Sequence, residues 1–490
     1  MLRMMAARLS LQPDPLGDGG NRTFGFPRLH AAASLKRAGA VANNTQTDIH
    51  IRSLHVMQNA TRFLLDDAHA GVGQDDVPSV FRLRQQFPRP VEPDLAAAVR
   101  REMTPVLANV EAGQRIAVTG SSRGIANLAL VVRECVSALR EAGADPFVAP
   151  TMGSHGGATA EGQRQVLADT NGITEESVGC RIESSMEVVQ IGTTGSGFPV
   201  YQDRLCHDAD GVLVVNRVKP HTGFTERVES GICKMLVIGM GKQAGASKIH
   251  HQALRLGMGR LVLEATRIIV ESARPRLVGA IALVENAFKE TAVVRGLPVG
   301  DCDALLDAES ALLEHAYALF PRLPFDELDG LIVDEIGKNV SGAGMDTNVI
   351  GKKDGLTRPQ IGAIYVRGLT EGTHGNAVGL GNADIMPRSL LPHVDLNSTY
   401  MNAFTAKRLS ICKVPMLVEN ELQALQVLLN FRAEEDPASL RLAWIRNTSM
   451  LDELWASQAL LDEARAHPSL EVLSEPAPIR LDDALTLVAP

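Results

Sequence analysis

Cysteine, long apolar runs and basic tracts are all scarce in this sequence. Only six residues are cysteine, and no two of them have CxxC spacing, which argues against a disulfide framework or a zinc site and favours a reducing compartment. No uninterrupted apolar stretch reaches the roughly 18 residues that a membrane-spanning helix needs. The net charge is −9 without a long basic tract, so nucleic acid and anionic membrane surfaces are not expected partners.

The remaining composition is that of an ordinary globular protein. Hydrophobic residues make up 45% and charged residues 21% of the 490 positions, as in soluble cytoplasmic domains. A chain of this length exceeds what one hydrophobic core usually fills. The prolines Pro321 and Pro324 mark the expected boundary. We therefore expect an N-terminal α/β cofactor-binding domain over 76–320 and a C-terminal α/β domain over 321–490, with a cleft between them.

Residues 1–75 differ from the rest in charge and in periodicity. A transit peptide is one interpretation of their arginine-rich, acid-poor character. A misplaced start, with Met57 as one internal start, and a disordered tail are the others; we expect a disordered N-terminal extension. The charged residues of the first forty positions are Arg3, Arg8, Asp14, Asp18, Arg22, Arg28, Lys36 and Arg37.

From residue 77 onward the sequence alternates strand and helix patterns, which is typical of a parallel α/β sheet. Ligands of such sheets bind at the carboxyl ends of the strands. Asp94 is the expected cap of the first helix. The expected strands are 115–119, 145–150, 212–215, 277–285, 330–333, 361–366 and 415–418. The expected helices are 95–107, 127–142, 159–171, 252–274, 300–320, 376–379, 399–410 and 422–430.

The stretch from Gly211 to His251 carries the strongest signs of chemistry. An apolar β-branched run over 212–215 predicts a buried parallel strand, and His221 follows its carboxyl end. Lys234 lies inside an apolar run, and His250 comes sixteen residues later. These residue types suit proton transfer, covalent or anionic ligand capture, and metal binding. The alternative is a glycine-rich packing loop whose histidines only fill space.

The segment 119–126 looks like the nucleotide loop of short-chain dehydrogenases. A strand precedes it and a helix follows it, so a pyrophosphate would meet a helix N-terminus. However, the last glycine of that pattern is Ala126, and none of the four tyrosines is followed by a lysine four positions later. No acidic residue clearly closes a second strand to hold a ribose. An NAD(P)-dependent oxidoreductase that uses this loop remains an alternative.

The same loop is also a candidate anion site. Arg123 suits a carboxylate or a phosphate, with help from Ser121, Ser122 and the backbone amides; the alternative is a solvated surface arginine. His155 lies in the loop after the next expected strand, between Gly153 and Gly156. Flexible backbone of this kind does not place a histidine in a core, so His155 is a candidate site residue.

Taken together, these residues resemble the nickel-dependent lactate racemase family over about residues 80–450. Arg123 occupies the place of the family's first-loop arginine, and His155 lies in a similar Gly-Ser-His loop. His221, in Pro-His-Thr-Gly-Phe-Thr, matches the family's Pro-His motif. The spacing between Lys234 and His250 matches that between the family's cofactor-bearing lysine and its nickel-ligating histidine. Between His221 and Lys234 this chain has a few more residues than the family pattern.

The resemblance implies a nickel-pincer nucleotide, made by cofactor-biosynthesis enzymes, and racemisation or epimerisation of a small 2-hydroxy acid. Lys234 would hold the cofactor through a thioamide, and His250 would ligate nickel. His155 and His221 would act as opposed acid–base groups. Arg123 would bind the cofactor phosphate or the substrate carboxylate.

Lys338 is a candidate second-domain lysine that faces the cofactor when the domains close. Two classes other than a racemase stay open: the oxidoreductase described above, and a non-catalytic binding relative.

Overall fold

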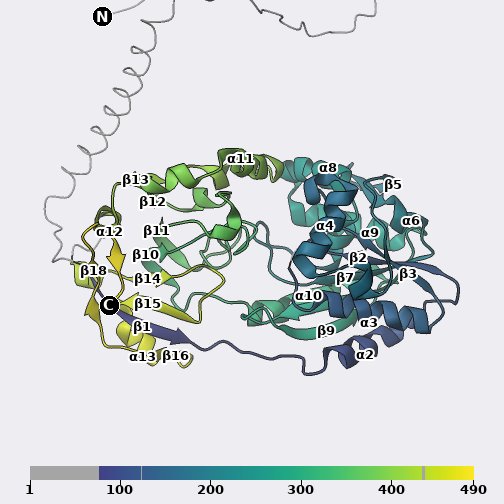
Figure 1. Ribbon diagram of the computed structural model, residues 1–490, viewed down its shortest axis with the longest axis horizontal. Coiled ribbons are helices and arrows are strands. Elements are labelled where there is room, and N and C mark those ends of the chain that lie inside the picture. Colours follow the sequence, from purple (N-terminus) through teal and green to yellow (C-terminus); the bar gives the residue numbers. More distant parts are fainter. Residues whose placement is uncertain (1–76, 123, 433–435) are drawn as a thin grey trace, which may run out of the picture. The chain divides into compact units, whose positions relative to one another are not determined.

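The computed structural model describes residues 77–490, apart from residue 123 and residues 433–435. The expectation for residues 1–75 and the role of Arg123 therefore lie outside the described residues. The described chain builds two large sheets, each accompanied by helices, and two further sheets of two strands each (Figure 1). The expected fold class, two α/β units, is confirmed.

The first sheet has the strand order β4-β3-β2-β7-β8-β9. Its strands run parallel except β9, which pairs antiparallel with β8. Connections between the parallel strands pass through helices, as expected for a sheet that is covered on both faces. The strands are β2 (Arg115–Gly120), β3 (Asp145–Pro150), β4 (Arg181–Ile182), β7 (Gly211–Arg217), β8 (Leu277–Glu285) and β9 (Thr291–Leu297).

Strand β7 shows why both faces of this sheet are apolar. Val212 and Val214 point into one core, while Leu213 and Val215 point into the other. The alternation follows from the two-residue period of a strand. The first core contains residues of α9 (Met258–Glu271) and α10 (Cys302–Leu319), and the second contains α2 (Leu95–Leu107) and α3 (Leu128–Glu141).

Several helices agree with the sequence expectation, and one does not. Helix α2 has the expected bounds, and the Asp94 side chain accepts a hydrogen bond from the Ala97 N–H at 3.0 Å. The single helix expected over 252–274 is wrong. Gly257, at φ 80°, separates α8 (Lys242–Leu256) from α9, because only glycine readily takes this backbone conformation. His250 consequently lies just past the middle of α8.

The second sheet has the order β13-β12-β11-β10-β14-β15-β1-β16. Its first five strands are parallel, and each of the remaining three pairs antiparallel with the strand before it in this order. Residues 76–320 were expected to form one unit, but β1 joins this second sheet. The strands are β1 (Ser79–Gln85), β10 (Glu327–Val333), β11 (Gln360–Val366), β12 (Ile385–Pro387), β13 (Met416–Val418), β14 (Leu442–Ile445), β15 (Glu453–Ser457) and β16 (Leu470–Val472).

We call the elements around the first sheet the first half and those around the second sheet the second half. In the second half, the helix expected over 376–379 is wrong, since that segment forms turns. The helix expected over 399–410 begins and ends earlier, as α11 (Leu396–Thr405), and a short 3-10 turn follows, η6 (Leu409–Cys412). Helix α12 (Glu421–Asn430) agrees closely with expectation. Among the described residues, no helix has the length and apolar character needed to cross a bilayer.

Candidate active site

His221 lies four residues beyond the carboxyl end of β7, in the loop opened by Pro220. Its imidazole packs on the Phe224 ring, with 4.3 Å between the ring centroids. The ring is half-buried. This is the position that the sequence predicted for a reactive group at the end of a parallel strand.

A backbone hydrogen bond determines which nitrogen of His221 carries the proton. The Gly223 N–H donates to Nδ1 over 2.9 Å, so Nδ1 presents its lone pair. In a neutral imidazole the proton is then on Nε2. His221 in this arrangement is a hydrogen-bond donor at Nε2.

A buried carboxylate holds the backbone of His221. The His221 N–H donates to Glu229 Oε2 over 2.5 Å, and the same oxygen accepts from Lys353 Nζ over 2.8 Å. Tyr317 completes the group, since its hydroxyl lies 2.9 Å from Glu229 Oε1 and 2.6 Å from Lys353 Nζ. Lys353 comes from the second half, and both charged side chains are almost fully buried.

This ion pair is one of several contacts between the halves around His221. Thr347 Oγ1 donates to the Thr222 carbonyl over 2.6 Å, and Asn348 Nδ2 donates to the His221 carbonyl over 3.3 Å. The loop that carries the imidazole is thus held from both sides. Neither Glu229 nor Lys353 was predicted from the sequence. The one signal for Glu229 was its place in the extra residues between His221 and Lys234.

Lys234 ends the short helix α7 (Ile232–Lys234), and the π-helical turn η2 (Met235–Gly239) follows directly. Such π-helical turns occur frequently at functional sites. The carboxylate of Glu309 enters beneath α7 and accepts the Cys233 N–H over 2.8 Å. A Cβ on Gly231 would lie 2.0 Å from Glu309 Oε1, so this approach requires glycine.

His250 and His221 are both neutral imidazoles near the lysine. Burial lowers the pKa of His250 to about 4, and the charges of Lys234 and Lys407 add to this effect. Burial also lowers the pKa of His221 well below its usual value. The charge of Lys234 is the second-largest cause, and the charges of other nearby groups add to it. The charge of Lys234 contributes to both shifts, and the charge of His250 contributes to that of His221, so the three side chains are electrostatic neighbours. His251, the neighbour of His250, is exposed.

His155 lies in the loop after β3, as predicted, and its side chain is exposed. Its Nδ1 and Ser122 Oγ are 2.5 Å apart, so the loops after β2 and β3 meet at this hydrogen bond. A hydroxyl can donate or accept, and His155 is therefore compatible with either tautomer. The Gly153 N–H donates to the Gly239 carbonyl over 3.1 Å, which joins the loop of His155 to the end of η2.

A buried lysine, Lys242, is connected to the loop of His155 through hydrogen bonds. Lys242 is fully buried and pairs with Asp203 over 2.8 Å. Its Nζ also donates to Gln163 Oε1 over 3.0 Å, and Gln163 Nε2 donates to the Gly153 carbonyl over 2.8 Å. Lys242 and Gln163 therefore position the loop, and neither was identified from the sequence.

Two backbone amides at the end of the 119–126 loop are already engaged. The Ile125 N–H donates to Asn171 Oδ1 over 3.1 Å, and the Ala126 N–H donates to Glu285 Oε1 over 2.7 Å. A pyrophosphate at this helix start would displace both partners and would meet the Glu285 carboxylate. This arrangement counts against the dinucleotide interpretation. In the same loop Ser121 is buried, and its carbonyl accepts from Asn171.

The remaining predicted residue, Lys338, belongs to the second half. Its Nζ donates to Asn402 Oδ1 on α11, and its backbone N–H donates to Thr373 Oγ1 over 3.2 Å. Lys338 is thus attached to α11. Figure 1 shows α11 beside α8, the helix that carries His250.

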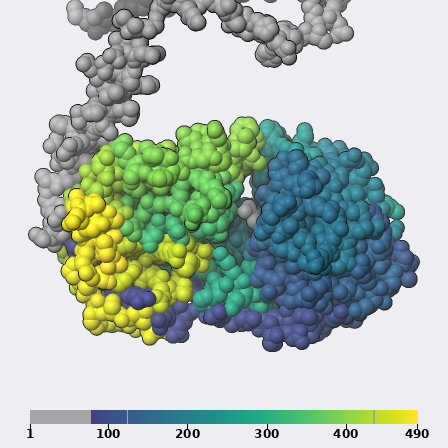
Figure 2. All heavy atoms as spheres, viewed as in Figure 1, coloured from purple at the N-terminus to yellow at the C-terminus, as the bar shows by residue number. Residues whose placement is uncertain are grey.

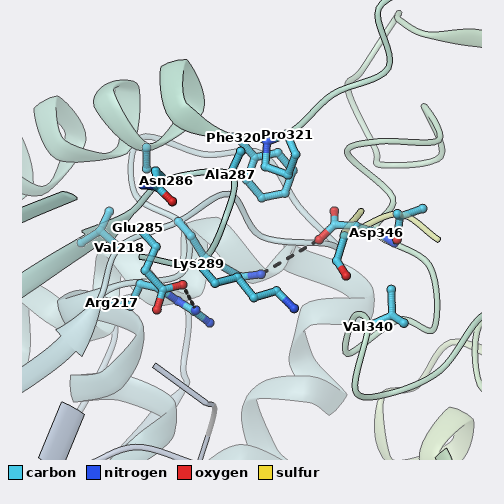
Figure 3. Close-up of a pocket in the computed structure, with 14 residues that line it drawn as sticks. Arg217, Val218, Glu285, Asn286, Ala287, Lys289, Phe320, Pro321, Val340 and Asp346 are labelled. Carbon is cyan, nitrogen blue, oxygen red and sulfur yellow. Dashed lines mark hydrogen bonds and ion pairs between the residues drawn. The ribbon is translucent and has the colours of Figure 1, made fainter. Parts of the chain in front are cut away.

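A pocket opens next to the His221 loop. Its walls come from the carboxyl ends of β7 and β8 and from Val340 and Asp346 of the second half (Figure 3). Lys219 lines this pocket, and its Nζ lies 4.0 Å from Asp346 Oδ2. The charge of Lys219 also contributes to the lowered pKa of His221. None of the three candidate histidines lines the pocket itself. Figure 2 shows an opening between the green surface of the second half and the blue surface of the first.

The side chains of Lys234 and His250 suit a metal ion whose other ligands come from a bound cofactor. Within the described part of the chain, no group of three or more His, Cys, Asp or Glu side chains is arranged to hold an ion. The imidazole of His250 is neutral, and the charge of the Lys234 amine acts on it. A pincer cofactor, which supplies its own donor atoms and needs one imidazole and one amine, suits this set.

Among known proteins, the chain is similar to solved structures. No family model matches the chain, and no curated protein matches it. The lactate racemase apoprotein from Thermoanaerobacterium thermosaccharolyticum matches with 13% sequence identity and a TM-score of 0.44. The match covers 78% of this chain and 95% of that one.

Proposed function

We propose that this protein is a racemase or epimerase of a small 2-hydroxy acid that uses a nickel-pincer nucleotide. The observation that carries the proposal is the grouping at the carboxyl end of β7. The charge of Lys234 acts on both His221 and His250, so an amine and two neutral imidazoles share one region. The proposal also draws on the sequence resemblance in the order and spacing of these residues.

Lys234 and His250 are the residues that would hold the cofactor. A lysine amine forms the covalent thioamide link, and a neutral imidazole is a good nickel ligand. When bound, the cofactor supplies a hydride acceptor for the α-carbon of the substrate. In the proposal Arg123, with Ser121 and Ser122, binds an anionic group of the cofactor or the substrate.

Attachment of the cofactor would itself change the two histidines. Burial is the largest cause of the low pKa of His221 and of His250, and the charge of Lys234 adds to it. A thioamide carries no charge, so converting Lys234 would remove that second contribution. The pKa of His221 then rises toward the range in which an imidazole exchanges protons. Loss of this one charge would act in favour of an acid–base role for His221, against the larger effect of burial.

His155 and His221 would exchange the hydroxyl proton of the substrate from opposite sides. His155 can present an unprotonated Nε2 when its Nδ1–H donates a hydrogen bond to the Ser122 hydroxyl oxygen. His221 donates from Nε2 as long as the Gly223 N–H occupies Nδ1. To accept a proton at Nε2, His221 must first release this hydrogen bond. The Gly223 contact is therefore the feature that would separate its donor and acceptor states.

The test is co-expression with the cofactor-making enzymes, followed by intact-mass and nickel analysis. We expect a covalent mass addition with nickel in the wild type and neither in Lys234→Ala. The loaded protein should abolish the optical rotation of one member of a panel of 2-hydroxy acids, and His155→Ala and His221→Ala should each prevent this. A Lys234→Ala protein that retained cofactor and nickel at full occupancy would contradict the covalent assignment. NAD(P) binding without nickel would support the oxidoreductase alternative.

A further inference from the structure

The turn between α11 and η6 brings two cations of the second half to the histidines of the first. The Arg408 N–H donates to the Ala403 carbonyl over 3.0 Å, and the Lys407 N–H donates to the Phe404 carbonyl over 3.2 Å. These two bonds form a Schellman motif, in which glycine usually takes the left-handed position. Lys407 occupies that position here, with φ 55°. A strained residue of this kind persists where the surroundings determine its place, often at a functional site.

Arg408 lies directly against the His221 loop. Its Nη1 is 3.2 Å from the point where a Cβ on Gly223 would stand. The Cε1 and Nδ1 atoms of His221 are 3.3 and 3.4 Å from the same point. The guanidinium of the second half and the imidazole of the first therefore converge on Gly223. Lys407 is close by, since its charge lowers the pKa of His250.

Among residues 77–122, 124–432 and 436–490, no carboxylate pairs with the guanidinium of Arg408. The residue is half-buried. By contrast, Arg367 in the same half pairs with Asp334 and Glu421, both at 2.7 Å. A partly buried cation without a counter-ion is costly unless an anion arrives. A guanidinium fork recognises carboxylate and phosphate oxygens in pairs.

We propose that Arg408 binds the carboxylate of the 2-hydroxy acid and is a substrate-binding residue contributed by the second half. The inference rests on the proposed function for the identity of the acid. In a 2-hydroxy acid the carboxylate carbon and the hydroxyl-bearing carbon are directly bonded. A carboxylate on Arg408 consequently places the hydroxyl beside His221, whose Nε2 is the donor. A cofactor phosphate shares the anionic chemistry, but it does not bring a hydroxyl to this imidazole.

The position of Arg408 also gives the substrate a structural role. The carboxylate would touch the second half while the hydroxyl touches the first, so a bound acid connects α11–η6 to the β7 loop. A neutral analogue of the same shape lacks the first contact. Discrimination between an acid and its amide is therefore the property that Arg408 should determine.

The test is calorimetric binding to the full-length protein, both as isolated and loaded with cofactor. The probes are the acid–amide pairs of lactate, malate and mandelate, together with inorganic phosphate. We expect the wild type to prefer at least one acid to its amide. Arg408→Met should weaken binding of that acid by roughly tenfold or more, as for a lost hydrogen bond to a charged group, and should leave amide binding unchanged. Arg408→Lys should restore part of the preference, and Lys413→Met, an exposed lysine of the same segment, should behave as wild type.

Each other outcome decides a separate question. An Arg408→Met protein that retains the acid–amide preference, or a wild type that prefers none of the acids, would overturn the role of Arg408. Loss of phosphate binding alone would assign Arg408 to a phosphate and also overturn it. A protein that discriminates through Arg408 but leaves optical rotation unchanged would support the carboxylate site and contradict the racemase proposal.

Discussion

Glu309 is a carboxyl group held in the core under the lysine-bearing turn. Burial raises its pKa from 4.5 to about 7, and its Oε1 has no hydrogen-bond partner among the described residues. When folding raises the pKa of a carboxyl group, its contribution to stability is complete at pH values below the pKa of the unfolded state. That stability is lost as the pH rises from 4.5 through about 7, and it corresponds to about 3 kcal/mol.

We therefore expect Glu309→Gln to remove a pH-dependent part of the free energy of unfolding. Relative to the variant, the wild type should lose about 3 kcal/mol between pH 5 and pH 8, as measured by urea unfolding at several pH values. Glu314→Gln, at an exposed position of α10, is the control and should follow the wild type. Parallel stability curves for wild type and Glu309→Gln would show that the carboxyl is not protonated in the fold.

At the residue scale, the sequence predicted residues that are marked by their local surroundings. His221 follows an apolar strand and Lys234 interrupts an apolar run, so neighbouring residues reveal them. Glu229 is different, because its partner Lys353 lies 124 positions further along the chain. A contact of that separation leaves no local pattern. Arg408 was missed for the same reason, since its importance arises only where the two halves meet.

In the turn after α11, the strained backbone of Lys407 lies next to Arg408, the proposed substrate-binding residue. A non-glycine residue in the left-handed conformation costs about 1 kcal/mol or more, and Lys407 has that conformation. We expect Lys407→Gly to raise the free energy of unfolding by about 1 kcal/mol and to raise the pKa of His250, because the nearby cation is removed. Denaturant unfolding and NMR titration of the imidazole measure the two effects.

Lys407→Ala separates strain from charge in this experiment. Alanine removes the cation but keeps the left-handed strain, so it should raise the pKa of His250 without the gain in stability. If alanine stabilised the protein as much as glycine, the backbone strain would not be the cause.

At the element scale, strands and helices with a clear period were predictable, and breaks within them were not. Strand β8 has the expected bounds because it is one continuous buried run, and helix α2 has them because its buried residues recur at helical spacing. The break at Gly257 went unpredicted, since apolar residues continue at helical spacing on both of its sides. A single glycine is tolerated within many helices, and only the packing of α8 and α9 determines that this one separates them.

For the whole molecule, the buried pair of Lys353 and Glu229 is a principal link between the halves. Removing one partner leaves an unpaired buried charge, which typically costs about 3–5 kcal/mol. We expect Lys353→Met and Glu229→Gln each to destabilise by this amount in denaturant unfolding. The double variant should be considerably more stable than the sum of the single effects predicts.

A surface pair provides the comparison for this cycle. Arg181 and Asp145 are 2.7 Å apart, but both side chains are more than half exposed, so Asp145→Asn should cost less than about 1 kcal/mol. Additive effects of the Lys353 and Glu229 changes would mean that the two side chains do not act as a pair.

The sequence predicted two α/β units but not the path of the chain between them. Strand β1 belongs to the second sheet although it precedes the whole first half. The chain therefore crosses between the halves twice, over 86–94 and again over 320–326 (Figure 1). Two covalent crossings define a line, and rotation about that line is the relative movement that stretches neither of them. A single linker would also permit twisting, which would carry Arg408 sideways from His221; with two linkers, the halves are restricted to a hinge-like motion that separates and rejoins the same pair of side chains.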